Sequence, residues 1–126
     1  MNPHEEWMVK AEHDLLSANK LFETGLYDTA IFHTQQCAEK ALKGFLALKR
    51  MPLQKSHDLV LLNNLCKEIE SSFNQLTDEC VFLNTRDVQF RYPSEEMEPT
   101  REEIAQAIIF AEKIFSFVKS LVQEKI

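Results

Sequence analysis

Apolar residues recur along this chain in several segments at steps of three and four positions, which is the period of a helix with one buried face. The first segment follows Asn2, a residue type that caps helix starts, and has Pro3 at the first helical position. Its inward positions are Trp7, Met8, Ala11, Leu15, Ala18 and Phe22. Gly25 ends the run. The pattern predicts a first helix between Pro3 and Gly25.

A second helix is predicted from about Tyr27 to Lys49, and its apolar arc is wide. The main stripe consists of Tyr27, Ala30, Ile31, Thr34, Ala38, Ala41, Phe45 and Leu48. Phe32, Leu42 and Leu46 lie to the side of this stripe, so the arc is wider than one neighbouring helix can cover. We expect a second packing surface here, which a partner subunit could supply.

Two shorter helices are predicted in the middle of the chain. Met51 and Pro52 end the second helix, and Ser56 is the predicted N-cap of the third. The apolar positions of the third helix are Leu59, Leu62, Cys66 and Ile69. A fourth helix is predicted from about Asn74 to Asp87. Its inward residues are Leu76, Cys80 and Leu83.

The last helix has the best-marked start. Thr100 and Glu103 form the S/T-x-x-E capping box, in which each side chain bonds to the other residue's backbone N–H. Its inward positions are Ile104, Ala107, Ile108, Ala111, Ile114, Phe115, Val118 and Val122, and the arc is widened by Phe110 and Phe117. The stretch from about Val88 to Pro99 is predicted to be an irregular connection, the kind of segment that often carries function.

Composition supports one all-α domain spanning residues 1–126. The 126 residues include only two glycines and four prolines, and most of the rest enter helices at low cost. A chain of this length can bury one core without disulfides or a metal. Cys37, Cys66 and Cys80 are odd in number and set among apolar residues, which favours a reducing, cytoplasmic location.

Three classes of function are disfavoured. The net charge of -6 opposes diffuse binding to nucleic acid, so any site for a polyanion must be local. A local basic cluster consists of Lys40, Lys43, Lys49, Arg50 and Lys55, and an acidic block of Glu95, Glu96, Glu98, Glu102 and Glu103. No continuous apolar run is long enough to cross a membrane. No His, Cys or carboxylate cluster has the spacing of metal ligands, so we expect neither metal nor cofactor.

The second helix carries a polar line formed by His33, Gln36, Lys40 and Lys43, spaced by three, four and three residues. Two ammonium groups and an amide could hold a phosphate and part of a base. Spacing alone favours a solvated helix face. Gln35 and Glu39 are expected to be more buried than Lys40, and they tie the helices together, satisfy a dimer seam or contact a ligand.

Two further positions could contact a ligand. His57 is predicted in the first turn of the third helix, where a neutral imidazole could bond a ligand, although a structural role is the better expectation. Arg86, Arg91 and Tyr92, followed by Pro93, could grip phosphate oxygens and stack on a base. The alternative is that Arg86 pairs with an acid and Tyr92 packs as a loop anchor.

Four motifs follow one another along nearly the whole chain. They are Trp7 with Ala11 and Asp14-Leu15, Tyr27-Asp28-x-Ala30-x-Phe32-His33-x-Gln35-Gln36-x-Ala38-Glu39-Lys40-x-Leu42-Lys43, Ser56-His57-Asp58-Leu59, and Arg91-Tyr92-Pro93. The second motif is the most specific. With these motifs the chain resembles a HEPN domain of the prokaryotic kind.

This resemblance implies an up-and-down helical bundle of four main helices plus a short extra helix, related to the substrate-binding helical domain that accompanies nucleotidyltransferases. It also implies a homodimer, encoded beside a minimal nucleotidyltransferase, that binds nucleotides or assists its partner. Many family members are toxins that cut RNA.

The RNA-cutting members share an arginine followed four to six residues later by a histidine, paired across the dimer into one metal-independent site. Arg86 matches the arginine, but Arg91 stands five residues later and no histidine follows His57. A guanidinium does not exchange protons near neutral pH, because its pKa exceeds about 12. The chain therefore departs from the cutting motif and keeps groups that bind phosphate.

Three functions follow as hypotheses. The first is a dimeric binding module for a nucleotide or RNA, working with a nucleotidyltransferase in a toxin–antitoxin-like pair. The second is a metal-independent RNase toxin that uses Arg86 with a surrogate base such as His57 or Tyr92. The third is a structural dimerisation domain. The missing histidine favours the first hypothesis over the second.

Overall fold

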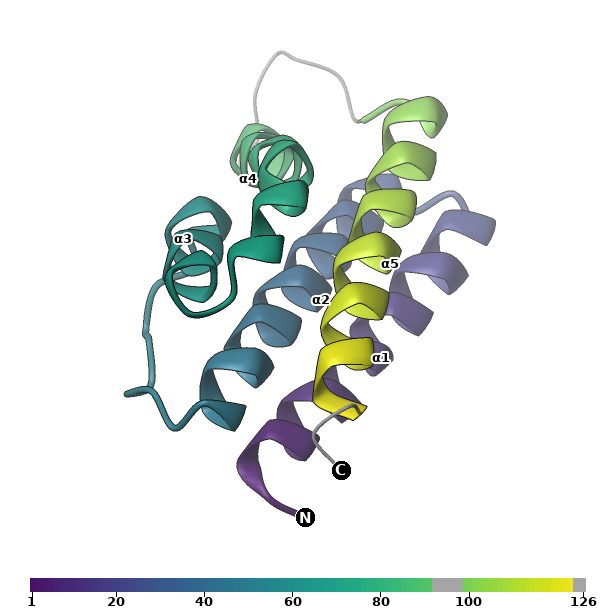
Figure 1. Ribbon diagram of the computed structural model, residues 1–126. Helices are drawn as coiled ribbons and strands as arrows, with labels where there is room; N and C mark the ends of the chain where they lie inside the picture. Colours follow the sequence, from purple (N-terminus) through teal and green to yellow (C-terminus); the bar gives the residue numbers. More distant parts are fainter. Residues whose placement is uncertain (92–98, 124–126) are drawn as a thin grey trace.

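The structure, a computed structural model, describes residues 1–91 and 99–123, and within these ranges it describes every side chain except those of residues 87–91. These ranges form five α-helices and one 3-10 helix, with no strand (Figure 1). They are α1 (Pro3–Glu23), α2 (Tyr27–Leu48), α3 (Leu59–Ile69), η1 (Ser71–Leu76), α4 (Thr77–Arg91) and α5 (Arg101–Gln123). The predicted all-α bundle is confirmed.

Helix α2 is the central element and contacts each of the other four α-helices. The long helices α1, α2 and α5 lie side by side, with α1 antiparallel to the other two (Figure 1). Helices α3 and α4 pack against α2, and α4 also contacts α5. We call α1, α2 and α5 the long layer, and α3, η1 and α4 the short layer.

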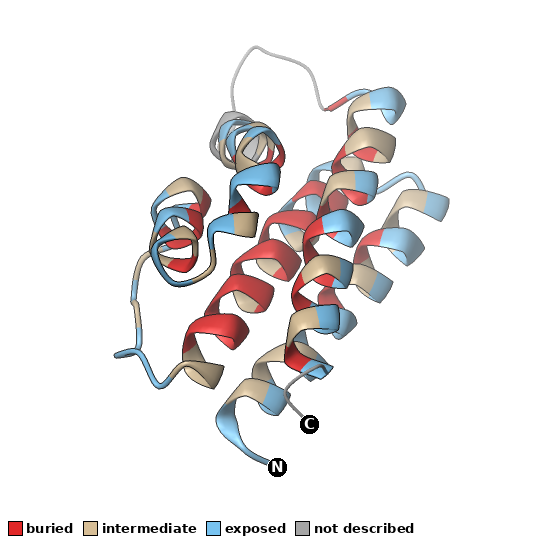
Figure 2. Cartoon of the chain, viewed as in Figure 1, coloured by how far each residue is buried: buried red, intermediate tan, exposed pale blue. Residues whose placement is uncertain are grey.

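The core lies where α2 meets its neighbours, as the buried positions in Figure 2 show. Three aromatic rings connect the two layers: Phe45 of α2 stacks against Phe73 of η1 at 4.6 Å, and Phe73 against Phe117 of α5 at 5.0 Å. Leu42 and Leu46 are buried within this single chain. The expected second packing surface of α2 is therefore the short layer of the same chain. Phe32 alone of the three flanking residues remains 42% exposed.

Side-chain caps set the starts of α1 and α5 as predicted. Asn2 accepts a hydrogen bond from the backbone N–H of Glu5, and the reciprocal bonds between Thr100 and Glu103 close the capping box of α5. Gly25 follows α1 with a φ of 79°, a conformation that glycine adopts without steric cost.

Three predicted boundaries differ from the structure. The N-cap of α3 is Asp58, not Ser56, because the Asp58 carboxylate accepts from the backbone N–H groups of Val60 and Leu61. Ser56 Oγ instead accepts from the backbone N–H of Asp58. The fourth segment begins as the 3-10 helix η1, and α4 then extends to Arg91, beyond the predicted end at Asp87.

The three cysteines are unpaired and buried, one in the long layer and two in the short layer. Burial raises the pKa of each thiol, that of Cys80 to about 12. In the part of the chain that the structure describes, no helix is both long enough and apolar enough to span a membrane.

Candidate functional site

A buried carboxylate, Glu39, organises polar residues in the middle of α2. Its Oε2 accepts a hydrogen bond from Lys43 Nζ at 2.9 Å, and its Oε1 lies 3.0 Å from His57 Nδ1. Gln35 Nε2 donates to Glu39 Oε1 at 3.2 Å and to the His57 carbonyl at 3.0 Å. Burial alone would raise the pKa of Glu39, but hydrogen bonds from Lys43 and His57 outweigh it and hold the pKa below its usual value. The charged carboxylate ties α2 to the segment before α3.

A second buried carboxylate, Asp14 of α1, faces α2. His33 Nδ1 lies 2.7 Å from Asp14 Oδ1, and Lys40 Nζ lies 2.6 Å from Asp14 Oδ2. Both partners keep part of their side chains exposed to solvent. This three-residue group joins α1 to α2 and places an imidazole and an ammonium at the surface between them.

The residues of the polar line predicted on α2 are therefore paired with other side chains. Lys40 pairs with Asp14, Lys43 pairs with Glu39 and is itself buried, and Gln36 Nε2 donates to Gln35 Oε1 at 2.8 Å. The interpretation of this line as a solvated helix face is wrong. A phosphate at Lys40 or Lys43 would have to compete with a carboxylate already in contact. Glu39 and Gln35 are more buried than Lys40, as predicted.

His57 does not lie in the first turn of α3, because that helix begins two residues later. Its side chain is 68% exposed, and only Nδ1 is held, by Glu39.

Asn84 of α4 fixes the turn before α3, since it donates to Asp58 Oδ1 and accepts from the backbone N–H of Leu59. Among the described residues, no group of three or more His, Cys, Asp or Glu side chains could hold one metal ion.

Arg86 lies on α4 between two groups that orient it. Its Nε is 3.2 Å from Glu103 Oε2 at the start of α5, and its guanidinium carbon is 4.4 Å from the ring centre of Phe82. Pairing of Arg86 with an acid was the alternative expectation, and Glu103 is that acid. Arg91 is the last residue of α4, and its side chain lies outside what the structure describes. Tyr92, with Pro93, lies outside the described residues.

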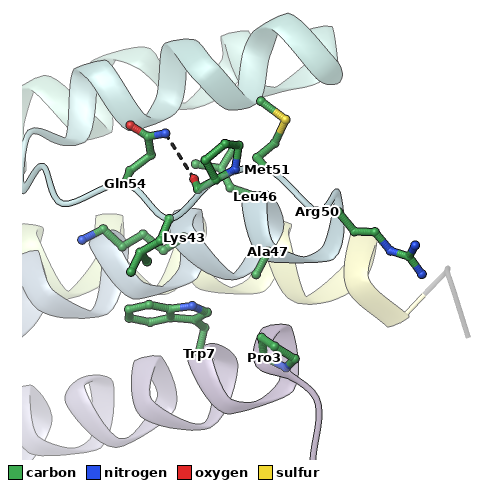
Figure 3. A pocket seen from close by; sticks show the side chains of 10 residues that line it. Pro3, Trp7, Lys43, Leu46, Ala47, Arg50, Met51 and Gln54 are labelled. Atoms are coloured by element: carbon green, nitrogen blue, oxygen red, sulfur yellow. Dashed lines mark hydrogen bonds between the residues drawn. The ribbon is translucent and has the colours of Figure 1, made fainter.

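A cavity of about 480 Å³ opens between the start of α1, the end of α2 and the segment that follows α2 (Figure 3). We call it the Trp7 cavity. Its lining residues are Pro3, Trp7, Lys43, Leu46, Ala47, Arg50, Met51, Pro52, Leu53 and Gln54. The indole of Trp7 forms one wall, and the stem of Lys43 crosses beside it (Figure 3). Of the predicted site residues described here, only Lys43 lines this cavity.

The helical periodicity places Trp7 in the core and does not predict this cavity. One signal was available, because Gly44 is the only glycine inside a predicted helix. A Cβ at Gly44 would lie 3.0 Å from Met8 Sδ and 3.3 Å from Trp7 Cβ. The missing side chain lets α1 approach α2 closely at the position of the indole.

Solved structures with this fold come from bacteria and archaea. TT1696 of Thermus thermophilus is 30% identical, covers 95% of this chain and 98% of its own, and superposes with a TM-score of 0.80. ST0689, described as an archaeal HEPN homologue, is 27% identical with a TM-score of 0.74, and covers 97% of this chain and 99% of its own. A HEPN domain protein of Thermotoga maritima, TM0613, is 25% identical with a TM-score of 0.70, covering 94% and 98%.

The sequence comparisons agree with the structural ones. A protein of Methanocaldococcus jannaschii, MJ1304, whose name describes it as a candidate toxin, is 28% identical over 94% of this chain and 88% of its own length. The model of the HEPN domain matches residues 4–121. That match spans both layers and all five α-helices, and the chain therefore belongs to the HEPN domain family.

Proposed function

We propose that this HEPN domain binds the phosphate of a nucleotide or of an RNA end and does not cleave it. The observation that supports this proposal is the setting of Arg86, whose guanidinium lies against the ring of Phe82 and meets Glu103 at Nε, so that a phosphate would bind at the two terminal nitrogens. A side chain that is already ordered loses little conformational entropy when it binds a phosphate. Arg91 would add a second guanidinium fork, and Tyr92 a ring for stacking on a base.

The absence of cleavage follows from proton chemistry. Attack by a ribose 2'-hydroxyl needs a group that accepts a proton near neutral pH, which histidine does and arginine does not. Arg91 stands at the position where RNA-cutting members of the family keep histidine. His57 Nδ1 is engaged by Glu39, and it belongs to the segment before α3, not to α4.

We further propose a homodimer that uses the outer face of α4 and α5. Phe82 and Phe110 stack edge to face at 5.1 Å where these helices meet, and both are only partly buried. Val81 and Ile109, next to them in sequence, are exposed. A two-fold contact over this face would bring the Arg86 side chains of both copies toward one interface. Light scattering at micromolar concentration tests it, and a clean monomer would contradict it.

The partner protein is the least direct part of the proposal. MJ1304 is named as a candidate toxin, which supports a toxin–antitoxin-like pair. The second member would be the nucleotidyltransferase implied by the family resemblance. Expression of this chain with and without the protein encoded beside it tests the pair. If this chain alone slows growth, only a partner that neutralises it would restore growth.

Arg91→His is the decisive substitution for the non-cleaving function, because it restores the arginine and histidine pair of the cutting members. We expect the natural protein to bind short RNA without degrading it, and Arg91→His to gain slow cleavage that Arg86→Ala abolishes. Both are measured by gel assay with purified protein.

A second candidate function is an RNase toxin, favoured by the name of MJ1304 alone. If the natural protein degrades RNA and Arg86→Ala removes that activity, the RNase function replaces the binding function. Arg101→Ala is a matched control, because Arg101 is also held between an aromatic ring and a polar partner, but these are Phe22 of α1 and Tyr27 of α2.

A further inference from the structure

The Trp7 cavity is bordered by apolar side chains that this chain leaves uncovered. Leu53 and Met51 at its rim are 68% and 40% exposed, and the Trp7 indole that forms one wall is only partly buried (Figure 3). Apolar groups gathered around a hollow mark an interaction site, whereas apolar groups scattered singly do not. The volume of about 480 Å³ lies within the range of roughly 300 to 1,000 Å³ that is usual for binding pockets.

The wall formed by residues 49–54 is ordered before anything binds. The backbone N–H groups of Arg50 and Met51 both donate to carbonyls of the last turn of α2 at 3.0 Å, and the φ of Arg50 is 58°. This is the Schellman pattern that ends many helices. Pro52 restricts the backbone that follows, and the Gln54 side chain donates to its carbonyl at 3.2 Å (Figure 3). An ordered surface loses little conformational entropy when it binds.

The charges around the cavity are positive, although the chain as a whole carries a net charge of -6. No acidic residue occurs from position 40 to position 57, and the basic residues there are Lys40, Lys43, Lys49, Arg50 and Lys55. The first two pair with buried carboxylates, whereas the other three have no carboxylate partner among the described residues. The Arg50 side chain extends from the rim toward solvent (Figure 3). This rim is suited to acidic groups that lie just outside the cavity.

The combination favours a protein segment over a nucleic acid. A nucleic acid is bound through several phosphate contacts, but of the two cations that line the cavity, Lys43 is already paired and Arg50 faces solvent. The exposed Leu53 and Met51 gain nothing from a phosphate backbone, whereas an apolar side chain placed beside them removes their surface from water. An acidic segment with one large apolar residue complements both the cavity and its rim.

We propose that the Trp7 cavity is a docking site for a partner protein, and that it takes a short acidic segment whose one large apolar side chain fills the cavity. The apolar side chain lies against Trp7 and Leu46, and the neighbouring acidic groups lie at Arg50. Affinity then comes from the buried anchor, while the outer charges set the association rate and the selectivity. The site does not depend on the proposed function, because Arg86 lies on α4 and is absent from the cavity lining.

Selection from a library of random short peptides determines what the site prefers. The baits are the whole natural chain and, in parallel, Leu53→Ser, which removes an exposed apolar group from the rim and leaves the core intact. We expect the peptides that only the natural chain enriches to share acidic residues beside a large apolar residue. Enrichment of basic or purely apolar peptides, or no difference between the two baits, would overturn the proposal.

The most enriched peptide that lacks tryptophan is then titrated into the whole chain, and Trp7 emission is followed. Trp7 is the only tryptophan of the chain, so a saturable change in its emission places the peptide at this cavity. Leu53→Ser, or serine in place of the peptide's apolar residue, should weaken binding about tenfold or more. Leu16→Ser is the matched control, because Leu16 is 59% exposed on α1 and absent from the cavity lining. An equal loss in both variants would mean that the peptide does not bind at the cavity.

Arg50→Gly tests the charged rim, because glycine fits the left-handed backbone and the change removes only the side chain. It should weaken peptide binding about two- to fivefold, as expected for an exposed ion pair, and reduce the dependence of binding on salt. Lys20→Ala removes one exposed positive charge at the end of α1 and should leave binding unchanged. If Arg50→Gly behaves like Lys20→Ala, the acidic part of the proposed segment is wrong.

Short single-stranded RNA is the competitor that separates this docking site from the proposed function. We expect RNA to bind through Arg86 without changing Trp7 emission and without displacing the peptide. If RNA displaces the peptide and Arg50→Gly weakens RNA binding, the cavity is a nucleic-acid contact and the docking proposal is wrong. If RNA does not bind at all while the peptide does, the proposed function fails and the docking proposal stands.

Discussion

Two buried carboxylates, Asp14 and Glu39, together hold four polar side chains of α2: His33, Gln35, Lys40 and Lys43. Asp14 has two side-chain partners and Glu39 has three, and each carboxylate connects α2 to another part of the chain. Removal of a buried acid leaves its partners desolvated and unpaired, which costs far more than loss of a surface pair such as Lys20 and Glu23 at 3.7 Å. The residues that most resemble a ligand site are thus also needed for folding.

Glu39 should make the stability of the domain depend on acid. Its folded-state pKa is depressed below the unfolded value of 4.5. The stabilisation is therefore fully present above that unfolded value and is lost as the pH falls through the folded pKa. Glu39→Gln cannot ionise, so we expect its free energy of unfolding to be about 2 kcal/mol lower at neutral pH and to change less on acidification.

Urea titrations from neutral pH down to about pH 3 measure this difference. Glu23→Gln is the matched control, because Glu23 is exposed and pairs only across one helical turn. Asp58, whose pKa is lowered by its hydrogen bond from Asn84, contributes equally in both variants. If the free energy of unfolding falls equally with pH in Glu39→Gln and in the natural protein, the ionised Glu39 carboxylate does not contribute this stability.

At the scale of elements, helix boundaries could be predicted wherever local capping sets them. Asn2 and the Thr100 and Glu103 pair act within one turn of chain, so α1 and α5 begin where the sequence predicts. The start of α3 could not be predicted, because Ser56 and Asp58 are both capping residue types. The choice depends on Asn84, which lies 26 positions after Asp58.

The candidate site was only partly predictable for a similar reason. Periodicity places Lys40 and Lys43 on one face of α2, but it carries no information about the carboxylates that face them. Asp14 comes from another helix, and Glu39 is turned inward on the same one. The Trp7 cavity depends on the path of residues 49–54, which no short-range pattern specifies.

The close approach of α1 and α2 depends on Gly44, and Gly44→Ala tests it. An alanine Cβ would press on Met8 Sδ at 3.0 Å and Trp7 Cβ at 3.3 Å. Overpacking of this kind costs about 1 to 3 kcal/mol, and the gain in helix propensity returns roughly 1 kcal/mol. We expect a net loss of about 1 kcal/mol in thermal or urea unfolding, together with a shift in Trp7 emission.

Ala47→Gly is the companion variant, because it changes propensity in the opposite sense on the same helix. If Gly44→Ala stabilises the protein and leaves Trp7 emission unchanged, Met8 has moved aside and the close approach is not required.

For the whole molecule, the division into a long and a short layer raises the question of whether the two separate as units. The short layer packs against α2 of the long layer, and the rings of Phe45, Phe73 and Phe117 stack across the boundary. The long layer is built from helices of 21 to 23 residues, whereas α3 has only 11. Shorter elements with less buried surface open at lower free energy.

The labelling rates of the three buried thiols measure how often each layer opens. Cys37 lies in the long layer, with Asp14 of α1 and Glu112 of α5 near it, whereas Cys66 and Cys80 are neighbours in the short layer. None can react with a thiol reagent until its surroundings open, so each labelling rate reports one opening event. We expect Cys66 and Cys80 to be labelled at the same rate and faster than Cys37. Mass spectrometry of the labelled peptides measures the rate at each cysteine. Simultaneous labelling of all three would mean that the domain exposes its interior only by unfolding completely.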